Sequence, residues 1–122
     1  MQKLIFIVDD NDANLTVAAF ALEREYRILT MPSAQKMFSL LEKKIPDLIL
    51  MDVEMPEISG LEAAARLKEN LQWKDIPVLF LTSYCDEKLL SEAKAIGGLD
   101  IINKPFTPSE LLENVIKYIE AG

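Results

Sequence analysis

Histidine is absent from this sequence of 122 residues. Its absence removes the commonest general base near neutral pH and the commonest ligand of transition metals. Any chemistry must therefore use carboxylates, hydroxyls and lysine, and the chain cannot itself carry a phosphohistidine. Cys85 is the only cysteine, so an intramolecular disulfide and a thiolate metal cluster are both excluded.

Positive charge and long apolar runs are also scarce. The chain has 13 lysines and arginines and 20 acidic residues, which gives a net charge of -7. We therefore expect no direct nucleic-acid binding. No apolar run approaches the ~20 residues of a membrane-spanning helix. These absences predict a cytoplasmic protein without a membrane partner.

The composition that remains is that of a folded protein. Half of the residues are hydrophobic and 27% are charged, and a chain of this length normally forms one core. We therefore expect a single domain over residues 1–122.

Short apolar segments alternate with segments of helical character. Strands are predicted at 4–8, 28–31, 48–51, 78–81 and 101–102, and helices at 14–25, 33–44, 60–70, 86–96 and 108–120. The strands are nearly continuous in apolar character, which favours a parallel sheet covered on both faces. The pattern predicts an α/β fold with a doubly wound five-stranded parallel sheet and five helices.

Polar residues follow four of the five predicted strands. Asp9 and Asp10 follow the first, Asp52 the third, Thr82 the fourth and Lys104 the fifth. Each alone is explained as a helix cap, a turn residue or a solvated lysine. Because the carboxyl ends of parallel strands converge, together they predict one crevice with three carboxylates, a hydroxyl and an ammonium group.

Clustered carboxylates repel one another unless a cation neutralises them. Mg²⁺ prefers a small set of oxygen ligands and retains several waters, so it fits this cluster. A carboxylate beside such a cation can attack phosphorus and form an aspartyl phosphate. The metal, Lys104 and Thr82 together can neutralise the charge of the phosphoryl oxygens.

Five segments of the sequence carry a specific resemblance. They are Ile-Phe-Ile-Val-Asp-Asp at 5–10, Leu-Ile-Leu-Met-Asp-Val-Glu-Met-Pro at 48–56, Ser-Gly at 59–60, Pro-Val-Leu-Phe-Leu-Thr at 77–82 and Lys-Pro-Phe at 104–106. In order and over the whole chain, they resemble the motifs of response-regulator receiver domains, the CheY-like superfamily of two-component signalling. The resemblance implies a flavodoxin-like strand order of 2-1-3-4-5.

The resemblance also assigns a metal site to four positions. It makes Asp52 the phosphoacceptor and, with Asp10, a direct ligand of Mg²⁺. Asp9 would hold the ion largely through water, and the backbone carbonyl of Glu54 would complete the protein ligands.

Three further positions take their expected roles from the same resemblance. Lys104 would pair with the carboxylate and then with the phosphoryl group, and the Lys104-Pro105 bond would be cis. Thr82 would move toward the phosphoryl group. Ile101 stands where many receivers have an aromatic residue that turns inward on activation, so this chain departs from the family pattern at that part of the switch.

A receiver domain would act as a phosphoprotein in a phosphorelay. It would accept a phosphoryl group from a sensor histidine kinase or a histidine phosphotransfer protein, and signal to a downstream effector domain or protein. A phosphorylation-linked dimer is a further expected partner state. The domain would not be an enzyme beyond catalysing its own phosphorylation and slow autodephosphorylation.

Two alternatives remain open at this point. A haloacid-dehalogenase-like phosphatase also uses an aspartate nucleophile and Mg²⁺, but it needs a second aspartate two residues later, where this chain has Glu54. The segment Asp10-Asn11-Asp12 has that spacing, although the chain lacks the length for the usual cap. The other alternative is a pseudo-receiver that is never phosphorylated, which the loss of Asp10, Asp52 or Lys104 would have favoured.

Overall fold

The computed structural model describes residues 2–120, in which five strands and five helices alternate along the chain. The expected domain bounds at 1 and 122 lie outside the described residues. The strands are β1 (Leu4–Val8), β2 (Arg27–Met31), β3 (Leu48–Asp52), β4 (Val78–Thr82) and β5 (Asp100–Asn103). The helices are α1 (Asp12–Leu22), α2 (Ala34–Leu41), α3 (Gly60–Glu69), α4 (Glu87–Ile96) and α5 (Pro108–Ile119).

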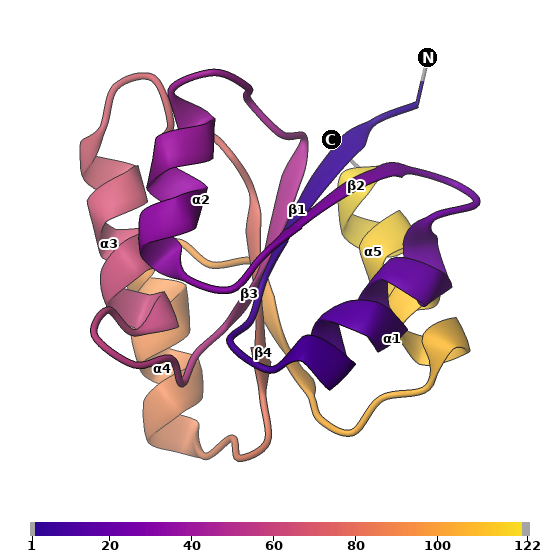
Figure 1. Ribbon diagram of the computed structural model, residues 1–122. Helices are drawn as coiled ribbons and strands as arrows, with labels where there is room; N and C mark the ends of the chain where they lie inside the picture. The colour runs from indigo at the N-terminus through magenta and orange to yellow at the C-terminus, as the bar shows by residue number, and fades with distance from the viewer. Residues whose placement is uncertain (1, 121–122) are drawn as a thin grey trace.

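All strand pairs are parallel and the sheet has the order β2-β1-β3-β4-β5, which confirms the predicted fold. Helices α1 and α5 cover one face, and α2, α3 and α4 cover the other (Figure 1). Each face contributes its own apolar core, one around Phe6 and Phe80 and the other around Ile5 and Leu50. Strand order reverses between β1 and β3, and in sheets of this kind ligand sites lie at the carboxyl ends of the strands on either side of such a reversal.

The two edge strands are less covered than their apolar sequences indicated. Every residue of β1, β3 and β4 is buried, whereas β2 buries only Met31 and exposes Arg27 and Thr30, and β5 buries only Ile102. An edge strand has a neighbouring strand on one side only, so solvent reaches its residues from the open side.

The first two helices differ from their predicted bounds. Helix α1 starts at Asp12 because the side chain of Asn11 accepts a hydrogen bond from the backbone N–H of Asn14 at 3.0 Å. It ends at Leu22, whose carbonyl oxygen accepts the N–H groups of both Glu25 and Tyr26 in a tight turn. Helix α2 ends early in the same way, where the Leu40 carbonyl accepts from two successive N–H groups.

The predicted start of α5 is confirmed. The Thr107 side chain accepts from the Glu110 N–H at 3.1 Å, and the Glu110 side chain accepts from the Thr107 N–H at 2.9 Å. Pro108 occupies the first turn, where a missing N–H costs nothing. Gly97 closes α4 with a φ of 98°, a left-handed conformation that favours glycine.

Gly60 fixes the loop that follows β3. A Cβ atom at this position would lie 2.1 Å from the carbonyl oxygen of Asp52, so only glycine permits the approach of α3 to the end of the strand. The Gly60 N–H donates to the Val53 carbonyl at 2.8 Å and closes the loop. Over residues 2–120, no helix is both long and apolar enough to cross a membrane.

Candidate functional site

The three aspartates predicted from the strand ends meet at the reversal of strand order. Val8 pairs with Met51 across β1 and β3, so Asp9 comes level with Asp52. Asp9, Asp10 and Asp52 each have a carboxylate oxygen within 4.8 Å of the other two. Asp9 and Asp52 are 1% and 5% exposed, whereas Asp10 is open to solvent. These three side chains form the acidic cluster.

Lys104 joins the cluster from the end of β5. Its Nζ lies 2.8 Å from Oδ2 of Asp9 and 3.3 Å from Oδ1 of Asp52, so one ammonium group serves two carboxylates. The Lys104 backbone N–H donates to the Thr82 carbonyl at 2.7 Å, which fixes the loop against β4. The Lys104-Pro105 peptide bond is cis, as the resemblance implied.

The electrostatics of the site penalise the charge on Asp52. Burial and the neighbouring charge of Asp9 raise the pKa of Asp52 from 3.8 to about 6, and Lys104 and the Glu54 N–H oppose this only in part. Burial lowers the pKa of Lys104, but the hydrogen bonds and charges of Asp9 and Asp52 outweigh it, so this pKa is raised overall. The acidic cluster therefore carries more negative charge than the Lys104 ammonium group can balance.

The three carboxylates differ in how many hydrogen bonds their oxygens accept from the protein. Both oxygens of Asp9 accept hydrogen bonds, Oδ1 from the Asn11 N–H at 2.9 Å and Oδ2 from Lys104. Asp52 receives the Glu54 N–H on Oδ1 at 3.3 Å. No hydrogen bond from residues 2–120 reaches Asp52 Oδ2 or either oxygen of Asp10. These oxygens are the ones available to an incoming ion.

Thr82 is fully buried at the end of β4. Its hydroxyl oxygen lies 2.8 Å from Oε1 of Glu54 and 3.0 Å from the carbonyl oxygen of Tyr84, so its one proton is shared between two acceptors. The hydroxyl oxygen also accepts the Tyr84 N–H at 3.2 Å. Sequence reasoning gave Glu54 a role through its backbone alone and missed this side-chain contact, whose only sequence signal is an acidic residue two positions after Asp52.

Ile101 lies in the middle of β5, paired with Phe80 of β4. It is partly buried against the core on the α2, α3 and α4 face. Position 101 is thus filled by a branched aliphatic side chain that packs inward, in place of an aromatic one.

A doubly wound sheet of this strand order, with acidic residues at its switch point, has the architecture of CheY-like proteins. The model of the response regulator receiver domain family matches residues 5–116. This chain belongs to that family, which confirms the resemblance in the sequence.

Individual relatives agree. The polar-differentiation response regulator DivK of Brucella ovis is 32% identical, with 98% of each chain covered. The phosphate regulon transcriptional regulatory protein PhoB of Pseudomonas aeruginosa is 38% identical over 90% of this chain, which spans 48% of PhoB, about half of its length. The solved structure of the chemotaxis protein CheY4 of Vibrio cholerae superposes with a TM-score of 0.91 at 26% identity, over 96% of this chain and 98% of that one.

Proposed function

We propose that this chain is a phosphoacceptor module that takes a phosphoryl group from a partner's phosphohistidine onto Asp52 and passes it on as a change of conformation. In this step the phosphorus–nitrogen bond of the donor breaks and a bond forms between phosphorus and a carboxylate oxygen of Asp52. The observation that supports it is the acidic cluster, in which the one buried carboxylate with a free oxygen stands beside an ammonium group.

The residues of the cluster fit Mg²⁺. Asp10 and Asp52 have free oxygens for direct ligation, and the Glu54 backbone carbonyl is the third protein ligand in this proposal. Asp9 already uses both oxygens within the protein, which suits a contact through water. When bound, the ion would offset the repulsion of the carboxylates and the charge of the phosphoryl oxygens.

Lys104 and Thr82 respond to the phosphoryl group in this proposal. Lys104 already bridges two carboxylates and needs little movement to pair with a phosphoryl oxygen beside Asp52. The Thr82 hydroxyl would leave Glu54 for the phosphoryl group and carry the loop at Tyr84 with it. The signal would thus pass into the start of α4.

The partners follow from this chemistry. The donor is a sensor histidine kinase or a histidine phosphotransfer protein, because this chain has no histidine of its own. The recipient is an effector domain or protein, and a second phosphorylated copy is an additional partner. In this proposal the protein acts in the cytoplasm. It catalyses only its own phosphorylation and the slow loss of that phosphoryl group.

Acetyl phosphate with Mg²⁺ tests the assignment. We expect intact-mass measurement to show one added phosphoryl group, peptide mapping to place it on Asp52, and hydroxylamine to remove it as it does an acyl phosphate. Asp52→Ala should abolish the label, whereas Asp75→Ala, at an exposed aspartate in the loop before β4, should retain it. A label on another residue would refute the proposal. Rapid hydrolysis of many acetyl phosphate molecules by each protein molecule would favour a phosphatase. The absence of any label would favour a pseudo-receiver.

A further inference from the structure

Strand β2 has an open outer edge. Among residues 2–120 it is the outermost strand of the sheet and pairs only with β1. The Arg27 N–H donates to the Lys3 carbonyl, and the Met31 carbonyl accepts from the Asp9 N–H, so alternate residues of β2 turn their main-chain groups toward β1. The residues between them, Ile28 and Thr30, therefore turn their N–H and C=O groups outward, where a further strand can pair with them.

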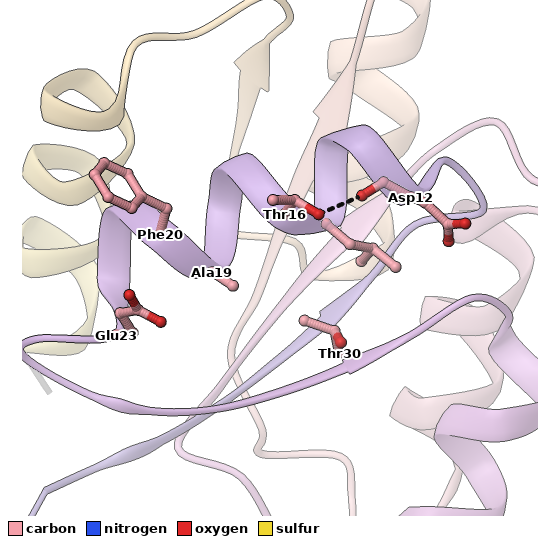
Figure 2. Close-up of a pocket in the computed structure, with 7 residues that line it drawn as sticks. Asp12, Thr16, Ala19, Phe20, Glu23 and Thr30 are labelled. Carbon is pink, nitrogen blue, oxygen red and sulfur yellow. Dashed lines mark hydrogen bonds between the residues drawn. The ribbon is translucent and has the colours of Figure 1, made fainter.

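A hollow lies on each face of the sheet beside this edge, and Thr30 lines both. On one face, a hollow of about 480 Å³ lies between β2 and α1, and Ala19 and Leu15 contribute apolar surface to it. Figure 2 shows Thr30 projecting from β2 toward α1, with Thr16 and Ala19 above it. We call this the α1-side hollow. On the other face, a hollow of about 300 Å³ between β2 and α2 includes Met31 and Leu40, and we call it the α2-side hollow.

The two hollows carry opposite charges. The ionisable side chains of the α1-side hollow are Asp12 and Glu23, which are both acidic and exposed. Those of the α2-side hollow are Lys36 and Lys43, which are both basic and exposed. A strand added to β2 would send successive side chains to opposite faces, and so into the two hollows in turn.

We propose that the open edge of β2 binds an extended segment of a partner protein as a sixth strand. The segment carries basic side chains on the face of the α1-side hollow, acidic side chains on the face of the α2-side hollow, and small apolar residues at its centre. Main-chain hydrogen bonds to Ile28 and Thr30 supply affinity, and the charged hollows select the alternating pattern. This site goes beyond the proposed phosphoacceptor function and requires no phosphorylation.

The charge pattern favours such a segment over a second copy of this chain. Two copies that paired antiparallel through β2 would keep each face on the same side. The acidic α1-side hollows would then adjoin one another, as would the lysines of the α2-side hollows. Repulsion between these adjoining like charges would oppose association.

A synthetic peptide of about nine residues provides the probe. Its odd positions are lysine or threonine and its even positions are glutamate or valine, so that each face carries one sign of charge. A control peptide of the same composition groups its lysines and glutamates in blocks and mixes the signs on both faces. We expect the alternating peptide to bind at least about threefold more tightly at low salt, given the size of exposed ion pairs. It should also slow hydrogen exchange at the amides of Ile28 and Thr30.

Variants of the protein locate the contact. Lys43→Glu should weaken the alternating peptide by about threefold, whereas Lys44→Glu, one residue farther on and outside the hollow, should change binding less than half as much. Thr30→Pro removes an outward N–H without touching the ladder to β1 and should abolish added protection at Ile28. Because the proline variant can fail to fold, the lysine pair carries the test independently.

Three results would overturn the inference. They are equal affinity for the two peptides, equal effects of the two lysine variants, and shifts confined to residues away from β2. A fourth is a dimer seen by sedimentation in the absence of peptide together with slowed hydrogen exchange at Ile28 and Thr30, because a second copy would then replace the partner segment.

Discussion

Replacing Asp52 by asparagine should stabilise the metal-free protein at neutral pH. Asp52 is 5% exposed and stands beside Asp9, and the two share one ammonium group from Lys104. Asparagine has nearly the same shape and retains an oxygen that can accept from Lys104, but it carries no charge. The substitution therefore removes an electrostatic penalty and leaves the packing unchanged.

The pKa of Asp52 determines how much its ionisation lowers the free energy of unfolding, and over which pH range. In the folded protein this pKa is about 6, against 3.8 for an unperturbed aspartate. A raised pKa means that the neutral acid favours the fold, so this contribution is complete below pH 3.8 and is lost as pH rises through about 6. Above pH 7 the ionised side chain lowers the free energy of unfolding by up to about 3 kcal/mol, at about 1.36 kcal/mol per pH unit.

Urea unfolding in EDTA measures this penalty directly. We expect Asp52→Asn to raise the free energy of unfolding by about 2–3 kcal/mol at pH 7.5 and by less than about 1 kcal/mol at pH 4. Asp10→Asn removes the same charge from the same cluster at an exposed position, so its gain should stay below about 1 kcal/mol. Saturating Mg²⁺ should narrow the difference between the wild type and Asp52→Asn.

Two outcomes would refute this reasoning. One is a less stable Asp52→Asn at pH 7.5. The other is a gain of the same size at pH 4 and at pH 7.5, because a gain independent of pH cannot come from the titration of a carboxylate.

Four other changes should have measurable effects on stability or on the switch. If Mg²⁺ binds with millimolar affinity, ~10 mM should add about 1.4 kcal/mol to the free energy of unfolding, and Asp10→Ala should remove most of this increment. Gly60→Ala should cost about 3 kcal/mol or more, because its Cβ would meet the Asp52 carbonyl oxygen at 2.1 Å; a loss below 1 kcal/mol on urea unfolding would contradict this. Thr107→Ala should cost about 1 kcal/mol by removing the cap of α5, and an unchanged thermal midpoint would count against it. In methyl NMR with beryllofluoride, which mimics the phosphoryl group, Ile101 should keep one rotamer while α4 shifts, and the reverse pattern would be evidence against our account of the switch.

The sequence predicts those features that depend on local chemistry or on the repeat of strand and helix. Strand β1 and the cap of α5 follow from apolar character and from the Thr-Pro-Ser-Glu signal at 107–110, and both match the structure. The convergence of Asp9, Asp52 and Lys104 follows from topology, because parallel strands of one sheet end at the same edge.

Other features depend on contacts that leave no local pattern. The end of α1 is set by a turn in which two N–H groups share the Leu22 carbonyl, and residues 23–25 retain good helical propensity. The contact of Glu54 with Thr82 joins residues 28 positions apart, and only the packing of β3 against β4 brings them together. To predict that β2 is partly exposed, one must know that it lies at the edge of the sheet. The apolar character of its residues does not reveal this position.

The hydrogen bond between Thr82 and Glu54 bears on how the domain would choose between its states. A hydroxyl has one proton to donate, and that proton is already shared between a carboxylate and a carbonyl before any phosphoryl group arrives. Movement of Thr82 to a phosphoryl group on Asp52 would therefore exchange one bond to an anion for another. The gain would be the small difference between two similar interactions. The residue at position 54 would then act as a competing acceptor, whose strength sets how firmly the unphosphorylated arrangement is held.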